Sequence, residues 1–218
     1  MKFEHTEVFN FGGAFRGLRN PKNSWNKSDS YYQTSYIEMP TNFIIGDKDM
    51  KLAQSLIKGG SEHRKFLRQI MVCVDITAPL YWFKEFDTYK VGTTANSTST
   101  MHKIASKPIT LDCFEICDYN ADTLNGNVRT HIESGLIPLL EDLRQKFNET
   151  GDKKYWKELI RWLPESWLQT RTITMNYENL LSMVHQRKNH KLVEWSEHFI
   201  EWARSLPYAK DLLFYGEG

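Results

Sequence analysis

The sequence has few cysteines, almost no net charge and no long apolar run. Its three cysteines, Cys73, Cys113 and Cys117, are too few for a disulfide framework. Lysine and arginine together number 28, and aspartate and glutamate together number 27, so no strong electrostatic field would attract a nucleic-acid polymer or a membrane surface. No stretch of about eighteen apolar residues is present, so we expect no membrane-spanning helix. The first residues also lack the apolar centre of a signal peptide, and we therefore expect a cytoplasmic location.

Aromatic residues are abundant by comparison. They make up 13% of the chain, with 7 tryptophans and 10 tyrosines. This content indicates either a large aromatic core or surfaces that become buried on assembly. At 218 residues the chain is long enough for one domain with a sizeable core. We expect a single domain over residues 1–218.

Periodic patterns predict strands and helices in alternation. Apolar residues at every second position predict a strand over Ile70–Ile76, and a β-branched run predicts another over Thr170–Met175. A third strand is expected from Ile109 to Cys117. Helical periodicity, with proline and glycine at the ends, predicts helices over residues 47–57, 138–151 and 155–163, and one or two more after Asn176 with a break near residues 188–190.

Residues 18–35 are polar and rich in turn-forming residues, so they are predicted to form a long loop. Basic and aromatic residues are interleaved in and just before this segment: Arg16, Arg19, Lys22 and Lys27 with Trp25, Tyr31 and Tyr32. These side chains can hold a phosphate and stack on a ring. The simpler interpretation is a solvated loop that packs its aromatic rings on the protein body.

Two other patterns also have two interpretations. His190, Glu194 and His198 recur every four residues, so on one helix they would share a face, as metal ligands do or as a solvated polar face does. We assign no metal site. The segment Gly92–Thr100 is rich in hydroxyl groups, and it can either cradle a phosphate through its backbone amides or form an exposed loop.

The C-terminal segment carries the most specific pattern. A Leu163–Pro164 pair is followed by the strand around Thr170, then by Asn176 and by a helix that contains Leu180 and Arg187. The strand is expected to deliver Asn176 and Arg187 to one strand-to-helix corner, where backbone donors and a guanidinium can meet an anionic or planar ligand. The order and spacing of these residues resemble the C-terminal signature of the flavin-dependent thymidylate synthases.

A second segment supports this resemblance, which covers roughly residues 58–206. His63 precedes the predicted strand, an Ala78–Pro79 pair follows it, and a short helix with Lys84–Glu85 comes next. The family has a flavin-contacting histidine, a strand, an Ala-Pro pair and a short helix in the same order.

This chain differs from the family in the family's central signature. Thr88, Tyr89 and Lys90 stand where the family has a basic Arg-His-Arg triplet. Arg68 occupies the place of a family glutamate near the flavin, and Glu178 occupies that of a family arginine. A lysine does not reproduce the bidentate fork of a guanidinium.

The resemblance implies an α+β fold, with a mostly antiparallel central sheet flanked by helices. It further implies a homotetrameric enzyme that transfers a one-carbon unit from methylene-tetrahydrofolate to a uracil nucleotide, dUMP, with reduced FAD as hydride donor and NADPH as reductant. The alternative left open by the changed central signature is a homologue that binds or modifies a different nucleotide without thymidylate synthesis.

The resemblance also implies roles for individual residues. Arg187 would hold the pyrimidine and take part in catalysis. His63, Asn176 and His190 would contact the flavin. The remaining substrate-binding candidates are Glu85, Lys90, Ser99 and Arg161, of which the last three would have to replace the missing phosphate-binding arginines.

Overall fold

The structure, a computed structural model, describes residues 1–33, 42–116 and 130–216. By its internal contacts the chain divides into two compact units. Unit 1 comprises Met1–Lys2, Ile76–Thr88 and Asn96–Thr172, and unit 2 comprises Phe3–Asp75, Tyr89–Ala95 and Ile173–Gly218. The single domain over residues 1–218 stays a prediction. None of the helices in the described ranges is both long and apolar enough to cross a bilayer.

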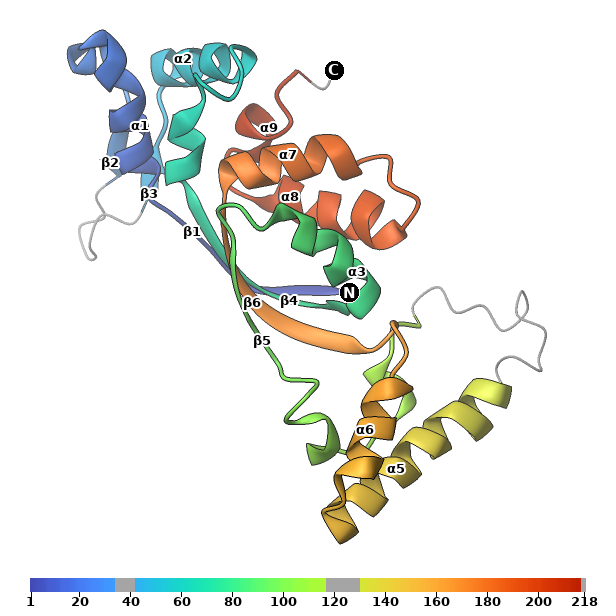
Figure 1. The fold of residues 1–218 in the computed structure, drawn as a ribbon. Coiled ribbons are helices and arrows are strands. Elements are labelled where there is room, and N and C mark those ends of the chain that lie inside the picture. The colour runs from blue at the N-terminus through green and yellow to red at the C-terminus, as the bar shows by residue number, and fades with distance from the viewer. Residues whose placement is uncertain (34–41, 117–129, 217–218) are drawn as a thin grey trace. The chain divides into compact units, whose positions relative to one another are not determined.

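An antiparallel sheet of four strands is the main β element (Figure 1). Its strands are β1 (Lys2–Phe9), β4 (Met71–Pro79), β5 (Thr94–Ser97) and β6 (Leu168–Asn176), in the order β1-β4-β6-β5. Together with the helices this confirms the predicted α+β class. Each of the four strands contributes residues to both units.

Strand β4 shows why the sequence pattern was informative. The side chains of Val72, Val74 and Ile76 are at most 1% exposed, while the residues between them are half-buried. Successive side chains of a strand point to opposite faces, so one face of β4 is buried in the core. Pro79 ends the strand and is the N-cap of α3 (Leu80–Phe86).

Unit 2 contains most of the aromatic core. Its helices are α1 (Phe11–Arg19), α2 (Asp47–Lys58), α7 (Tyr177–Arg187), α8 (Ile200–Ser205) and α9 (Ala209–Leu212), with 3-10 turns over Lys65–Gln69 and a π-helical stretch over Glu194–Phe199. Phe11 meets Tyr177 edge-on at 5.6 Å between ring centroids, and Phe3 stacks on Trp202 at 4.6 Å. The buried Tyr177 hydroxyl donates to the Pro207 carbonyl, so this buried polar group is satisfied.

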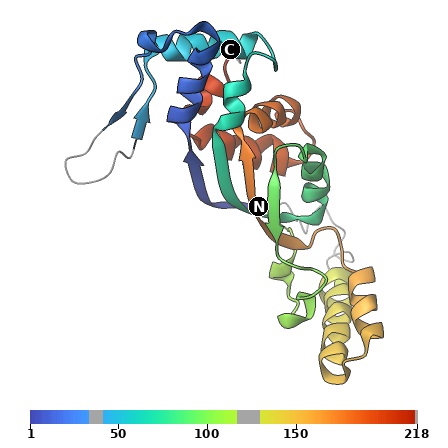
Figure 2. The same cartoon turned by 60° about the vertical axis from the view of Figure 1, so that its left-hand side comes forward.

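The predicted loop over residues 18–35 is more ordered than expected in its described part. Helix α1 extends to Arg19, short 3-10 turns follow over Asn20–Lys22 and Trp25–Lys27, and β2 (Tyr31–Gln33) pairs with β3 (Asn42–Ile44) (Figure 2). The physical reason is a buried Arg19–Asp49 ion pair that holds the segment on α2. Residues 34 and 35 lie outside the described ranges.

Unit 1 contains a helical pair, α5 (Ile137–Thr150) and α6 (Lys153–Arg161), which lie side by side (Figures 1 and 2). Gly151, with φ 68°, terminates α5 as predicted, because a glycine adopts this left-handed conformation without strain. A π-helical turn over Ile132–Leu136 precedes α5. On α5, Glu141 accepts hydrogen bonds from Arg144, which is the main reason why the pKa of Glu141 is lowered to about 2.

The strand predicted from Ile109 to Cys117 is wrong over its described residues. A 3-10 turn occupies Leu111–Cys113, and one isolated bridge joins Phe114 to Trp167. Ile109 and Phe114 are buried in an apolar cluster with Leu140 and Leu159, from α5 and α6. The apolar residues that suggested a strand therefore serve helix packing. Cys117 lies outside the described residues.

Candidate functional site

A cavity of about 480 Å³ in unit 2 lies where β6 passes into α7. Its walls come from the turn before the Lys65–Gln69 segment, the stretch around Gly92, and the first turns of α7. The residues that line it are Ser61, Arg64, Arg68, Val91, Gly92, Asn176, Glu178, Asn179 and Ser182. A volume in this range suits a small organic ligand.

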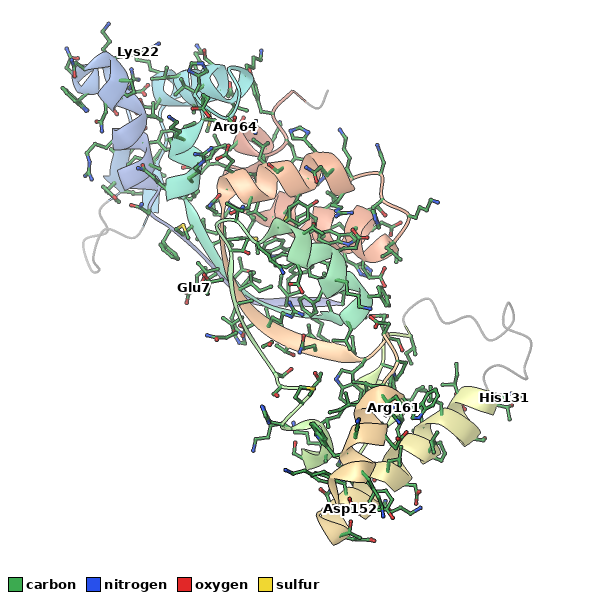
Figure 3. All side chains as sticks on the ribbon, in the orientation of Figure 1. Glu7, Lys22, Arg64, His131, Asp152 and Arg161 are labelled. Carbon is green, nitrogen blue, oxygen red and sulfur yellow. The ribbon has the colours of Figure 1, made fainter. Side chains whose placement is uncertain are left out.

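Two arginines and one glutamate set the charge of this cavity. Arg64 Nε donates to Glu178 Oε1 at 3.1 Å, and Arg68 Nε donates to Glu178 Oε2. Burial acts to raise the pKa of Glu178, but the hydrogen bonds and charges of both arginines outweigh it, so this pKa lies below its ordinary value. Glu178 is therefore a carboxylate, and the three side chains carry a net charge of +1. Figure 3 labels Arg64, which lies next to the first turn of α7.

Asparagine side chains fix the other wall of the cavity. Asn176 Oδ1 accepts from the Asn179 backbone N–H at 3.0 Å, and Asn179 Oδ1 accepts from the Asn176 backbone N–H at 3.2 Å. This reciprocal capping box starts α7. Asn179 Nδ2 also donates to the Val91 carbonyl at 2.8 Å, which ties the following Gly92 against the helix start.

Gly92 is a position where the absence of a side chain matters. Its φ is 81°, and a Cβ there would lie 3.0 Å from Asn176 Nδ2 and 3.2 Å from Asn179 Oδ1. The backbone therefore approaches the two amides closely, in a conformation that glycine tolerates best. The cavity thus offers guanidinium donors, amide groups and a helix N-terminus, which together suit an anionic or planar polar ligand.

Asn176 and Arg187 are not brought together at one corner as expected. Asn176 is the N-cap of α7 and Arg187 is its last residue, so a rise of 1.5 Å per residue separates them by about 16 Å. Asn176 lines the cavity described above, whereas Arg187 is not among its lining residues. The prediction was wrong here because a strand-to-helix corner delivers only the first turn of the helix.

Arg187 lies in an aromatic environment at the far end of α7. Its Nε donates to the Tyr89 hydroxyl at 2.8 Å, and its guanidinium carbon lies 5.4 Å from the Tyr89 ring centroid and 5.0 Å from that of Trp195. His190 stands beside the same Trp195, with ring centroids 6.5 Å apart. Arg187 and His190, predicted for different ligands, are therefore neighbours through Trp195.

The remaining predicted residues of unit 2 lie elsewhere. His63 is exposed and lines a separate cavity of about 430 Å³ next to the end of α1. The Lys90 side chain is exposed, and its carbonyl accepts from the Thr93 N–H. Among the described residues no three His, Cys, Asp or Glu side chains form a group that can hold a metal ion.

Three predicted residues belong to unit 1. Glu85 is half-buried on α3. Ser99 Oγ accepts from the His102 backbone N–H at 2.9 Å, a contact that stabilises its own turn. Arg161, labelled in Figure 3, ends α6 and pairs with Glu158 on the same helix. These contacts give Ser99 and Arg161 local structural partners.

The sequence reasoning missed Arg64 and Asn179 as cavity residues. A signal for Asn179 was available, because an asparagine three residues after an N-cap asparagine has the spacing of a capping box. Arg64 had no comparable signal. Its role depends on Glu178, which is 114 residues away along the chain.

Comparison with known proteins identifies the fold as that of the flavin-dependent thymidylate synthases. Among the solved structures that the chain resembles are those of ThyX from Helicobacter pylori. One crystal structure of that enzyme complexed with FAD and dUMP has a TM-score of 0.69 and 17% sequence identity, covering 99% of this chain and 98% of that one. A second structure of Helicobacter pylori ThyX with FAD and dUMP has a TM-score of 0.67, with the same identity and coverage.

No protein-family model and no curated protein matches the sequence. At 17% identity the likeness to the solved structures establishes the fold, and the resemblance predicted from the sequence is confirmed at that level.

Proposed function

We propose that this protein is a flavin-dependent thymidylate synthase-like enzyme, which transfers a one-carbon unit from methylene-tetrahydrofolate to dUMP with reduced FAD as hydride donor. The observation that carries the proposal is the cavity of net charge +1 at the start of α7. The whole-chain likeness to structures that hold FAD and dUMP supports it.

The residues of this cavity fit a flavin cofactor. Arg64 and Arg68 supply N–H donors and positive charge for a pyrophosphate, and the positive end of the α7 dipole also favours an anion. Gly92 lets the backbone approach the amide side chains of Asn176 and Asn179 closely, which holds these two polar groups at the cavity wall. When bound, the flavin would supply the hydride, and the protein would supply binding and orientation.

The other assignments follow from the proposed reaction. His63 and His190 are candidates for further flavin contacts, and Arg187 for the pyrimidine. Glu85, Lys90, Ser99 and Arg161 are candidates for the nucleotide. NADPH as reductant, a homotetrameric assembly and a cytoplasmic location complete the proposal.

Replacing Arg64 with glutamine tests the flavin assignment. The purified wild-type protein is expected to bind FAD, measured by titration of flavin absorbance or fluorescence. Arg64→Gln should weaken this binding about tenfold or more, because a hydrogen bond to a charged group is worth about 1.5–3 kcal/mol. The neighbouring exposed Lys65→Gln is the matched control and should bind FAD normally. The proposal would be contradicted if the wild-type protein bound no FAD in this titration.

One observation favours a second function, the binding of a different nucleotide without thymidylate synthesis. Tyr89 occupies a position of the family's basic triplet, and its hydroxyl accepts the hydrogen bond from Arg187 Nε. The Tyr89 ring thus lies against Arg187, the arginine expected to hold the pyrimidine.

Complementation of thymidine-requiring bacteria separates the two functions. Growth with the wild-type gene, lost with Arg187→Ala, is the expected result for the synthase, because that change removes the guanidinium proposed to hold the pyrimidine. Failure to grow, combined with nucleotide binding measured by calorimetry and lost in Arg187→Ala, would favour the second function. The matched control is Lys188→Ala, one residue further along and exposed.

A further inference from the structure

A separate cavity in unit 2, of about 290 Å³, lies between α1, the segment 25–30 and the β2–β3 pair. Its residues take no part in the proposed thymidylate synthase-like function. Four of its lining side chains combine aromatic rings with a positive charge: Arg16, Trp25, Tyr31 and Tyr32. We call these four residues the aromatic patch.

The aromatic patch exposes rings that proteins normally cover. Trp25 is 51% exposed, Tyr31 58% and Tyr32 54%. Large aromatic side chains contribute strongly to binding when their exposed faces become covered. Three of them around one cavity therefore indicate a surface that receives a ring.

Two of the rings are held in place by the protein. Trp25 Nε1 donates to Asn20 Oδ1 at 2.8 Å. Tyr32 meets Phe43 edge-on at 5.0 Å between centroids, and its hydroxyl lies so close to Gly12 that a Cβ there would stand 1.9 Å from it. The rings are thus positioned before any ligand arrives, which lowers the entropic cost of binding.

A buried polar network supports the segment that carries the patch. Arg19 Nε donates to Asp49 Oδ1 at 2.7 Å, and Arg19 Nη2 donates to the Lys27 carbonyl at 3.3 Å. The hydroxyls of Ser28 and Ser30 both donate to Asp49 Oδ2, at 2.5 and 2.6 Å. Asp49 is fully buried and Arg19 is 6% exposed, so the network fixes the backbone from residue 27 to residue 30.

The charge of the cavity favours an anion. Asp49, which is buried, balances Arg19, and no carboxylate of the described residues lines the cavity. Arg16 is exposed and makes no hydrogen bond or ion pair with any described residue. Its guanidinium is therefore available to a phosphate, for which it has the appropriate fork geometry.

We propose that the aromatic patch is a binding site for a nucleoside monophosphate, with the base on the exposed rings and the phosphate on Arg16. Exposed aromatic rings bind bases by stacking, largely independently of base identity. The small volume admits one ring and one phosphate, so a mononucleotide fits better than a longer strand.

Calorimetry of the full-length protein with AMP, adenosine and inorganic phosphate tests this assignment. AMP should bind at least tenfold more tightly than either fragment, because only AMP engages both the rings and Arg16. Arg16→Gln and Trp25→Leu should each weaken AMP binding about tenfold. Lys51→Gln, an exposed cation on the neighbouring α2, is the matched control and should leave AMP affinity unchanged.

The proposed flavin cavity is tested apart from the patch. Arg16→Gln should retain FAD binding, and Arg64→Gln should retain AMP binding at the patch, because the two sets of lining residues do not overlap. The indole N–H signal of Trp25, assigned by its loss in Trp25→Leu, should shift on addition of AMP.

Two results would overturn the assignment. One is AMP binding that is unchanged in both Arg16→Gln and Trp25→Leu, or absent in the wild-type protein. The other is a change of oligomeric state in Trp25→Leu by sedimentation, which would make the patch a contact between copies of the chain.

Discussion

Replacing Asp49 with alanine is expected to lower the free energy of unfolding by about 3–5 kcal/mol. The change leaves the Arg19 guanidinium buried without its carboxylate, and it removes the acceptor of two serine hydroxyls. An uncompensated buried charge is among the most costly defects in a folded protein. Thermal unfolding should show a fall of roughly 10 °C in the midpoint.

Matched variants distinguish the loss of the charge pair from the loss of packing. The double variant Arg19→Met/Asp49→Leu removes both charges and should recover part of the lost stability, because no lone charge remains. Asp47→Ala, an exposed carboxylate two residues earlier on α2, should change stability little. An Asp49→Ala protein within about 1 kcal/mol of the wild type would contradict the importance of the buried pair.

Low pH is also expected to destabilise the protein through the Asp49 carboxylate. Burial tends to raise the pKa of Asp49, but hydrogen bonds from two serines and from Arg19, together with the arginine charge, lower it below the ordinary value. A carboxylate with a depressed folded-state pKa contributes stability that is full above its unfolded pKa, about 3.9, and is lost as pH falls through its folded pKa. Urea unfolding of Asp49→Asn should therefore depend less on pH below about pH 4 than that of the wild type.

The second large effect on stability is expected from variants that reverse the charges of Arg68 and Glu178. The single variants Arg68→Glu and Glu178→Arg should each lower the midpoint of urea unfolding, because each places like charges against one another around Glu178 or its replacement. The double variant Arg68→Glu/Glu178→Arg contains the same three charges as the wild type in a different arrangement. It should recover most of the stability in urea unfolding.

The charges at these two positions are the reverse of those that the family resemblance predicts. The sequence resemblance places Arg68 at a glutamate position of the flavin-dependent thymidylate synthases and Glu178 at an arginine position, and the structure pairs these two side chains. The two expected departures are therefore complementary in charge. FAD titration of the double variant adds a functional measurement, because the cavity retains its net charge of +1. Additive losses in the double variant would show that the two residues do not act as a pair.

The sequence predicted some strands and helices correctly and others wrongly. The alternation from Val72 to Ile76 predicted both the strand and its buried face. Helix α2 was predicted at Asp47 and begins there. The strand predicted after Ile109 was wrong, because a short apolar stretch has the same composition whether it packs on helices or pairs in a sheet.

The sequence by itself determined the fold class, the strands β4 and β6, the helices α2, α5 and α6, and the resemblance to the flavin-dependent thymidylate synthases. These depend on periodicity and spacing, which report on neighbours a few residues apart. The tertiary structure alone decided that Arg68 pairs with Glu178, 110 residues away, and that Arg187 donates to Tyr89, 98 residues away. Such contacts depend on how distant segments pack, and no local pattern encodes which charge will meet which.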